Sequence, residues 1–135
     1  MTATVIVYGI PAPQGSKKHV GNGMMVESSK KVMPWREAVK WAWKTAQLEC
    51  IPGPVKVSVV FTVPKPSSAP KRRVTYPGKK PDIDKLIRST FDALSDVGAW
   101  EDDARVVELW TAKKYPGEGW GALATPGAVI KIEAI

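Results

Sequence analysis

The stretch KKPDIDKLIRSTFDALSDVGAWEDDARVV, residues 79–107, holds most of the carboxylates of a chain that is otherwise basic. Its apolar residues recur at helical spacing between Ile83 and Leu94, which predicts a helix with one face packed against the rest of the protein. Pro81 and Asp82 mark the start of this helix. Proline disfavours helix for the residue before it, and an Asp carboxylate can accept hydrogen bonds from the free N–H groups of a first turn. The segment is therefore predicted to be a docked, amphipathic helix.

Two acidic clusters flank the predicted helix, and the turn at Gly98 returns the chain toward it, with Trp100 as an apolar anchor. The acids before and after the helix are Asp82 and Asp84, and Glu101, Asp102 and Asp103. If the clusters meet, two like charges about 4 Å apart repel by roughly 4 kcal/mol at an effective dielectric near 20. A hard cation such as Mg²⁺ would neutralise them and retain waters that a substrate phosphate can replace. A purely structural interpretation also stands: a cap at Asp82, a helical ion pair between Asp84 and Arg88, and a solvated turn.

The same run resembles the signature of the RusA family of Holliday-junction resolvases, which are endonucleases of phages and prophages. An Asp-x-Asp pair opens a helix, Phe-Asp-Ala-Leu follows, and Gly, an aromatic residue and Asp-Asp precede a Val-rich strand. These motifs cover about a fifth of the chain. The order of strands and helices in the remainder is compatible with the family.

The resemblance implies a Mg²⁺-dependent hydrolase of four-way junctions and other branched DNA, with Mn²⁺ as an alternative metal. The metal ligands that it implies are Asp82, Asp84 and Asp103, and Asp102 is a weaker candidate. Where the family has a Lys one turn after the second Asp, this chain has Arg88, and where the family has Asn after the pair, it has Lys85. Either residue could be the cation that assists catalysis. The resemblance also implies a homodimer, whose two-fold symmetry suits nicking two strands of like polarity.

The remaining segments predict one domain over residues 1–135, of the α/β or α+β class, with two main helices on a mixed sheet of at least four strands. Strands are expected at residues 4–10, 55–63, 106–110 and 128–135, and a first helix from Pro34 to about Cys50, in the order β-α-β-α-β-β. The strand at 55–63 alternates apolar and polar residues, so it should be half-buried. The residues expected on the buried face of the first helix are Trp35, Val39, Ala42, Trp43 and Ala46, and Trp41 points to another side.

The chain carries a net charge of +7 and has a pI of about 9.6, which predicts a polyanionic partner. A loop at residues 64–81 is basic and has no acid, so it could bind the DNA backbone and deliver a phosphate to the carboxylates that follow. A second basic loop is expected at residues 11–23, where the glycine spacing excludes a phosphate-binding P-loop. The residues predicted to bind DNA are Lys17, Lys18, Lys71, Arg72, Arg73, Lys79 and Lys80. Tyr76 is expected to pack, with stacking on an unpaired base as the alternative.

Several classes of protein and site are disfavoured by the composition. The single cysteine, Cys50, excludes an internal disulfide, suits a reducing cytosol and is expected to be buried. The single histidine, His19, disfavours His-based metal clusters and triads. No membrane-length apolar run or signal segment is present, which predicts a cytoplasmic protein, in a bacterial host if the phage resemblance holds. The alternative function is a catalytically inert, basic DNA-binding protein.

Overall fold

The computed structural model describes residues 1–14, 17–20, 24–27 and 30–135, with side chains described for 1–14 and 30–135. In chain order the elements are β1 (Thr2–Tyr8), β2 (Lys17–Val20), β3 (Met24–Glu27), α1 (Val32–Thr45), β4 (Val55–Thr62), α2 (Ile83–Asp96), the 3₁₀ helix η1 (Asp103–Arg105), β5 (Val106–Lys114) and β6 (Gly127–Ala134). The predicted order β-α-β-α-β-β is confirmed for the main elements. The loop expected at residues 11–23 is wrong in part, because β2 pairs with β3 as an antiparallel hairpin.

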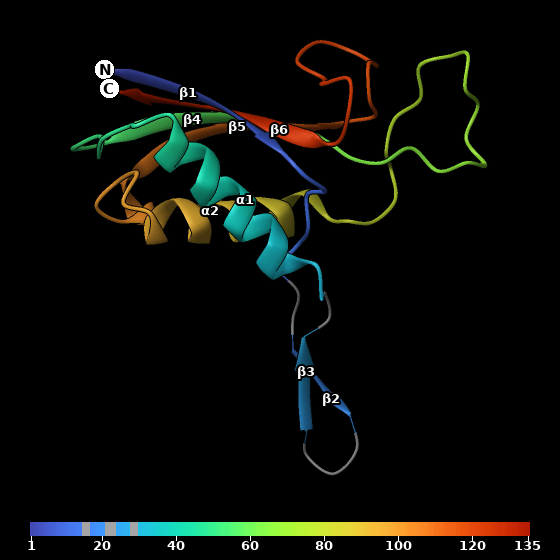
Figure 1. The fold of residues 1–135 in the computed structure, drawn as a ribbon, viewed down its shortest axis with the longest axis horizontal. Coiled ribbons are helices and arrows are strands. Elements are labelled where there is room, and N and C mark those ends of the chain that lie inside the picture. Colours follow the sequence, from blue (N-terminus) through green and yellow to red (C-terminus); the bar gives the residue numbers. More distant parts are fainter. Residues whose placement is uncertain (15–16, 21–23, 28–29) are drawn as a thin grey trace.

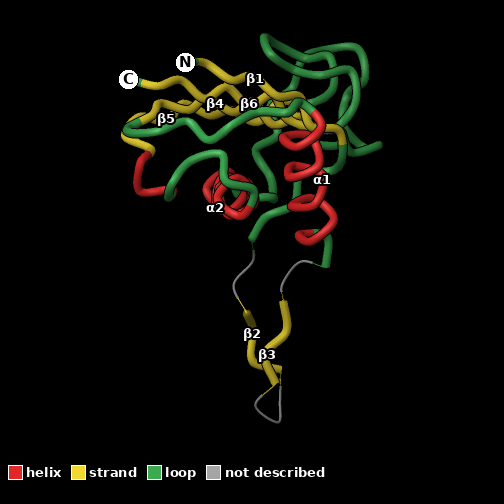
Figure 2. The backbone as a smooth tube through the Cα atoms, turned by 60° about the vertical axis from the view of Figure 1, so that its left-hand side comes forward, coloured by secondary structure: helices red, strands yellow, loops and turns green. Residues whose placement is uncertain are grey.

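The four main strands form a mixed sheet in the order β1-β6-β4-β5, which confirms the predicted α+β architecture. β6 is antiparallel to both of its neighbours, β1 and β4. β4 and β5 are parallel, because the chain crosses through α2 between them. Both helices lie on one face of this sheet, and the β2–β3 hairpin projects away from the body beyond them (Figures 1 and 2). The sheet face opposite the helices is called the open face below.

The half-buried character predicted for β4 holds only in its first part. Lys56 is exposed between the buried Val55 and Val57, but Val60 and Thr62 are buried as well. The segment after β5 covers these positions. A Cβ atom on Gly121 would lie 2.9 Å from Cγ2 of Val60. The backbone N–H of Leu123 donates to Oγ1 of Thr62 at 2.9 Å. The second half of β4 is therefore enclosed from both faces.

The two helices pack against each other through the predicted apolar face of α1. Trp35, Val39 and Trp43 are buried, and Nε1 of Trp35 donates to Oγ1 of the buried Thr90 on α2 at 3.1 Å. Ala42 is partly buried against the core. The hydrogen bond satisfies both polar groups in a dry environment and fixes α2 beneath the sheet.

Three predictions about the end of α1 and the residues that follow it are wrong. The helix ends at Thr45 rather than near Cys50, and Ala46 is exposed rather than on the buried face. Gln47 follows with a φ of 54°, so the chain leaves the helical path there. Cys50 is a free, exposed cysteine and not a buried apolar side chain. Helical periodicity alone did not reveal where the chain turns.

The turn after α2 confirms the expectations for Gly98 and Trp100. Gly98 has a φ of 78°, which a residue with a side chain rarely adopts. Trp100 is 2% exposed, meets the ring of Phe91 edge-to-face at 5.1 Å, and donates from Nε1 to Oγ of Ser95 at 2.8 Å. These contacts tie the segment that carries the second acidic cluster to α2.

Candidate active site

The first acidic cluster lies at the start of α2, as predicted. Asp82 is the N-cap residue by position, but its side chain makes no capping hydrogen bond, so that part of the expectation is wrong. One of its oxygens lies instead 3.7 Å from Nζ of Lys85. Asp84 is exposed in the first turn, where the helix dipole favours negative charge. Two carboxylates thus face solvent at one end of α2.

The second acidic cluster lies beyond the other end of α2, in η1 and the residue before it. A hydrogen bond with the Asp102 carboxyl, burial, and the charges of Asp102 and Asp92 raise the pKa of Asp103. Asp102 also accepts from the N–H of Ala104 at 3.3 Å. Asp92 is a half-buried residue of α2 that the sequence pattern did not single out. Asp102 and, more weakly, Asp92 are therefore the acids that act on Asp103.

The two clusters are linked by one exposed side of α2. Asp84, Arg88 and Asp92 follow one another at intervals of four residues, so they share a helix face. Asp84 and Asp92 are about 12 Å apart along the axis at 1.5 Å per residue. The electrostatic neighbours of Asp103 are Asp102 and Asp92, with Asp84 not among them. The structure brings Asp82 close to Asp84, and Asp103 close to Asp92, at separate points along α2.

The donor chemistry of these clusters fits a hard divalent cation, because every side chain offers carboxylate oxygen. Within residues 1–14, 17–20, 24–27 and 30–135, no three His, Cys, Asp or Glu side chains stand in a group that could hold a metal ion. The ligands fit by type, but they are not gathered around a single point. The assignment of Asp82, Asp84 and Asp103 to a metal stays a prediction.

The two candidate assisting cations differ in their surroundings. Lys85 is paired with Asp82 and is half-buried, with its side chain 37% exposed. Arg88 is exposed, and no ion pair joins it to Asp84, so the structural alternative of a helical pair is not realised between these described residues. Arg88 is thus the freer cation, midway between Asp84 and Asp92.

Residues 64–81, here called the basic loop, lead directly into the first acidic cluster. The loop projects beyond the end of the sheet (Figure 1, yellow-green). The predicted DNA-binding residues of this loop are all exposed: Lys71, Arg72, Arg73, Lys79 and Lys80. Tyr76 is 79% exposed, so the expectation that it packs is wrong and its ring is available for stacking. The predicted Lys17 and Lys18 lie in β2, and their side chains are outside the described part of the chain.

The basic loop is held to the body at two places. Glu118, on the segment after β5, pairs with Nζ of Lys65 and accepts from the N–H of Thr75 at 2.9 Å. The hydrogen bond from Lys65, followed by that from Thr75, lowers the pKa of Glu118. Nζ of Lys113 donates to the carbonyl oxygens of Lys79 at 2.9 Å and of Pro81 at 2.8 Å. These contacts fix the position of both ends of the loop relative to the sheet.

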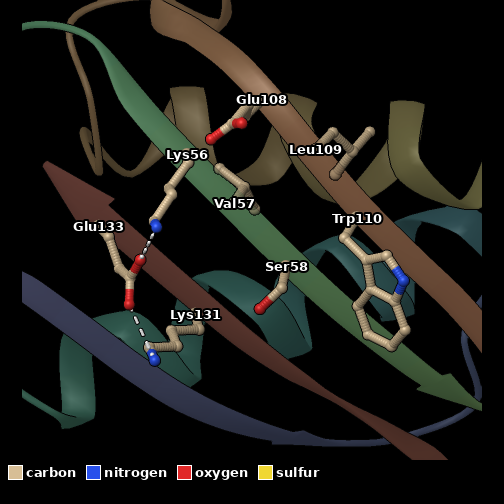
Figure 3. A pocket seen from close by; sticks show the side chains of 8 residues that line it. All are labelled: Lys56, Val57, Ser58, Glu108, Leu109, Trp110, Lys131 and Glu133. Atoms are coloured by element: carbon tan, nitrogen blue, oxygen red, sulfur yellow. Dashed lines mark ion pairs between the residues drawn. The ribbon is translucent and has the colours of Figure 1, made fainter. Parts of the chain in front are cut away.

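A separate hollow of about 400 Å³ lies on the open face of the sheet, among side chains of β4, β5 and β6 (Figure 3). Glu133 accepts there from Lys131 at 2.8 Å and from Lys56 at 3.1 Å. These bonds, with that from Lys131 the stronger, hold the pKa of Glu133 below its usual range. Ser58 and Trp110 also line the hollow. Its two lysines share Glu133, the lining holds Glu108 as a second carboxylate, and the hollow contains none of the predicted site residues.

The Endodeoxyribonuclease RusA family matches residues 9–133, which is nearly the whole chain. The chain belongs to the RusA endodeoxyribonuclease family. As a RusA-type protein it is a hydrolase that acts on DNA, which confirms the predicted enzyme class. A search of curated proteins found no match. The matched region includes the basic loop, α2 and η1, and it begins after β1.

None of the described helices is both long enough and apolar enough to cross a membrane.

Proposed function

We propose that the protein is a Mg²⁺-dependent endonuclease that resolves Holliday junctions and cuts other branched DNA. The observation that carries the proposal is the direct succession, in a RusA-family chain, of an exposed basic loop without acids and two solvent-facing carboxylates at the start of α2. Such a succession can hold a DNA strand and present one of its phosphates to the acidic side of the helix. The expected setting is the cytoplasm of a bacterial host, with a phage or prophage origin.

Asp82, Asp84 and Asp103 are proposed to hold Mg²⁺, with Mn²⁺ as an alternative. When bound, the ion supplies Lewis-acid activation of a water and neutralises charge on the phosphate. The three carboxylates supply the hard oxygen ligands that such an ion prefers. Asp92 and Asp102 are close to Asp103 and would raise the negative charge around it.

Arg88 is proposed to stabilise the charge that develops on the scissile phosphate. It is exposed, is not paired with Asp84, and lies on the helix face that joins the two acidic clusters. A guanidinium remains charged at any pH of interest, so it acts as a fixed cation and not as a proton donor. Lys85 is the alternative, although its pairing with Asp82 already uses part of its charge.

The basic loop is proposed to bind the sugar-phosphate backbone without reading sequence. Its exposed cations are positioned by Glu118 and Lys113, so they should select DNA by the path of its strands. We further propose that the protein acts as a homodimer, because two like active sites related by a two-fold axis can nick two strands of like polarity. The dimer would then match the symmetry of a four-way junction.

The test is cleavage of a labelled synthetic four-way junction with Mg²⁺. Asp82→Asn, Asp84→Asn and Asp103→Asn should each abolish cleavage while junction binding stays intact or tightens, because a charge that repels phosphate is removed. Asp96→Asn is the matched control, since Asp96 lies at the far end of the same helix and pairs with Arg36 at 2.5 Å. Wild-type binding without cleavage or metal affinity would favour the inert DNA-binding alternative, and full activity in all three variants would refute the site assignment.

A further inference from the structure

β1 is an edge strand whose one neighbour among the described strands is β6. The N–H of Ala134 donates to the carbonyl of Met1, and the N–H of Gly9 donates to Pro126, so odd-numbered residues turn their backbone groups toward β6. The backbone groups of the even-numbered residues, from Thr2 to Tyr8, therefore face outward. Proteins usually protect such edges with charges, proline or bulges. The sequence TATVIVY contains no charged residue and no proline, and its pairing with β6 has no register shift.

A hollow of about 580 Å³ runs along this edge between β1 and α1. Its lining has no charged side chain and consists of Thr4, Val5, Ile6, Tyr8, Ala38, Trp41, Ala42, Thr45 and Ala46. Trp41 is 72% exposed and Ile6 is 45% exposed. Ala46 continues the apolar face of α1, but its side chain is exposed in the single chain. The apolar surface of α1 thus extends past the part that its own sheet buries.

The absence of charge in this hollow favours a second copy of the chain as its occupant. In a chain of net charge +7, contact between two copies generally brings like charges together, but the lining of this hollow carries neither sign. The other sheet edge, β5, is less suited, because it contains the charged residues Glu108, Lys113 and Lys114, whereas β1 contains none. An uncharged strand such as β1 can pair antiparallel with itself about a two-fold axis.

We propose that two copies of the chain associate by antiparallel pairing of β1 with β1, with both Trp41 side chains in the interface. A register centred on Val5 pairs all seven residues of the strand and sets Thr4 opposite Ile6 of the second copy. The result is one continuous sheet of eight strands. This inference rests on the homodimer proposed above and names its surface. β1 precedes the region that the family matches, whereas Trp41 of α1 lies within it.

Pairing through β1 also fixes how the two active sites face the substrate. The two-fold axis of such a pair is perpendicular to the sheet, so both α2 helices lie on the same side of it. Seven strand spacings of about 4.8 Å separate the two β5 strands, which places them about 34 Å apart. Both α2 helices are then presented on one side of the dimer, and the two basic loops, which follow the same end of β4 in each copy, lie at opposite ends of the continuous sheet.

Sedimentation equilibrium of the protein without DNA or metal tests the interface. The wild type should be a dimer at micromolar concentration. Trp41→Glu should weaken the dimer by at least about 30-fold, because it places a charge at the centre of an apolar contact. Trp120→Glu is the matched control, since Trp120 is 75% exposed and lies outside the hollow. It should remain dimeric.

Ala46→Glu provides a second variant at an exposed position, in case Trp41→Glu disturbs folding. Hydrogen exchange adds a direct readout, because the amides of Thr4 and Ile6 should be protected in the dimer and exchange rapidly in both variants. A monomeric wild type, dimers that persist in both variants, or unprotected Thr4 and Ile6 amides in a wild-type dimer would each overturn the proposal. Because no DNA is present, a protein that dimerises through β1 but fails to cut junctions would refute the proposed nuclease function alone.

Discussion

Arg88 is the residue whose substitution best separates catalysis from structure. It is exposed and makes no ion pair with Asp84, so its removal should cost the fold little. Arg88→Ala should lower the single-turnover cleavage rate by at least about tenfold, which is about 1.4 kcal/mol of barrier, with little change in Tm or junction affinity. Arg88→Lys should retain much of the rate, because the charge is kept in the form that the family uses.

Lys85→Ala is the internal control for the Arg88 assignment. Lys85 already pairs with Asp82 at 3.7 Å, so its removal should change the rate less than the loss of Arg88 does. A large loss of rate in Lys85→Ala together with wild-type cleavage by Arg88→Ala would transfer the catalytic role to Lys85.

At the level of single residues, sequence patterns located the acids but did not establish how they are grouped. Asp82 and Asp84 lie together because they share one helix start, which spacing alone can predict. Asp92 was missed, although it belongs to the Phe-Asp-Ala-Leu motif and follows Arg88 by four residues. The four-residue spacing would have placed Asp92 on the same side of α2 as Asp84 and Arg88. Its proximity to Asp103 depends on the turn at Gly98, which periodicity cannot specify.

The basic loop is anchored by Glu118, and this anchor should make stability depend on pH. The pKa of Glu118 is lowered in the folded protein, so its stabilising contribution is present above the unfolded value of about 4.3 and is lost as the pH falls through the lower, folded value. Glu118→Gln should therefore melt at a lower temperature than the wild type at pH 7, with the difference shrinking below about pH 4.

Thermal melts across this pH range test the Glu118 anchor. Glu37→Gln is the control, because Glu37 is an exposed acid of α1 that pairs with Lys40 on the same helix at 3.0 Å. A difference between wild type and Glu118→Gln that stays constant with pH would show that the carboxylate charge is not what holds the loop.

The charge of the basic loop should appear in the salt dependence of binding. Replacing Lys71, Arg72 and Arg73 together with Ala should weaken junction binding and reduce the slope of log affinity against log salt by up to about 0.9 for each phosphate that the loop no longer neutralises. The three side chains are exposed, so Tm should be unchanged. A slope equal to that of the wild type would show that the loop is only a connection between β4 and α2.

For whole elements, the sequence predicted type and order better than ends and partners. The first helix was expected to reach Cys50 because apolar residues continue the pattern, but the positive φ at Gln47 ends it earlier. The second half of β4 was expected to face solvent on one side, yet the segment around Gly121 covers it. The first error arises from a local backbone conformation that the apolar pattern does not encode, and the second arises where a distant part of the chain covers the strand.

At the scale of the whole molecule, the basic loop and the second acidic cluster occupy different places, although the chain as a whole has a net charge of +7. The basic loop leaves β4 and returns at the start of α2, while the second acidic cluster follows the helix. The mixed sheet was predicted from the order of strands and helices along the chain. The strand order β1-β6-β4-β5 was not predicted, because it depends on which edges of the sheet remain open after the chain crosses through α2.

The position of β6 between β1 and β4 has a consequence for biosynthesis. β1 emerges from the ribosome first, but its partner in the sheet is the last of the described strands to be made. Gly127 leaves no room for a side chain beside β1, since a Cβ there would lie 2.1 Å from the carbonyl oxygen of Val7. The sheet therefore cannot close until β6 has been translated, and a chain lacking Gly127–Ala134 should remain protease-sensitive and show no cooperative melt. We expect nuclease activity to require β6 for the same reason.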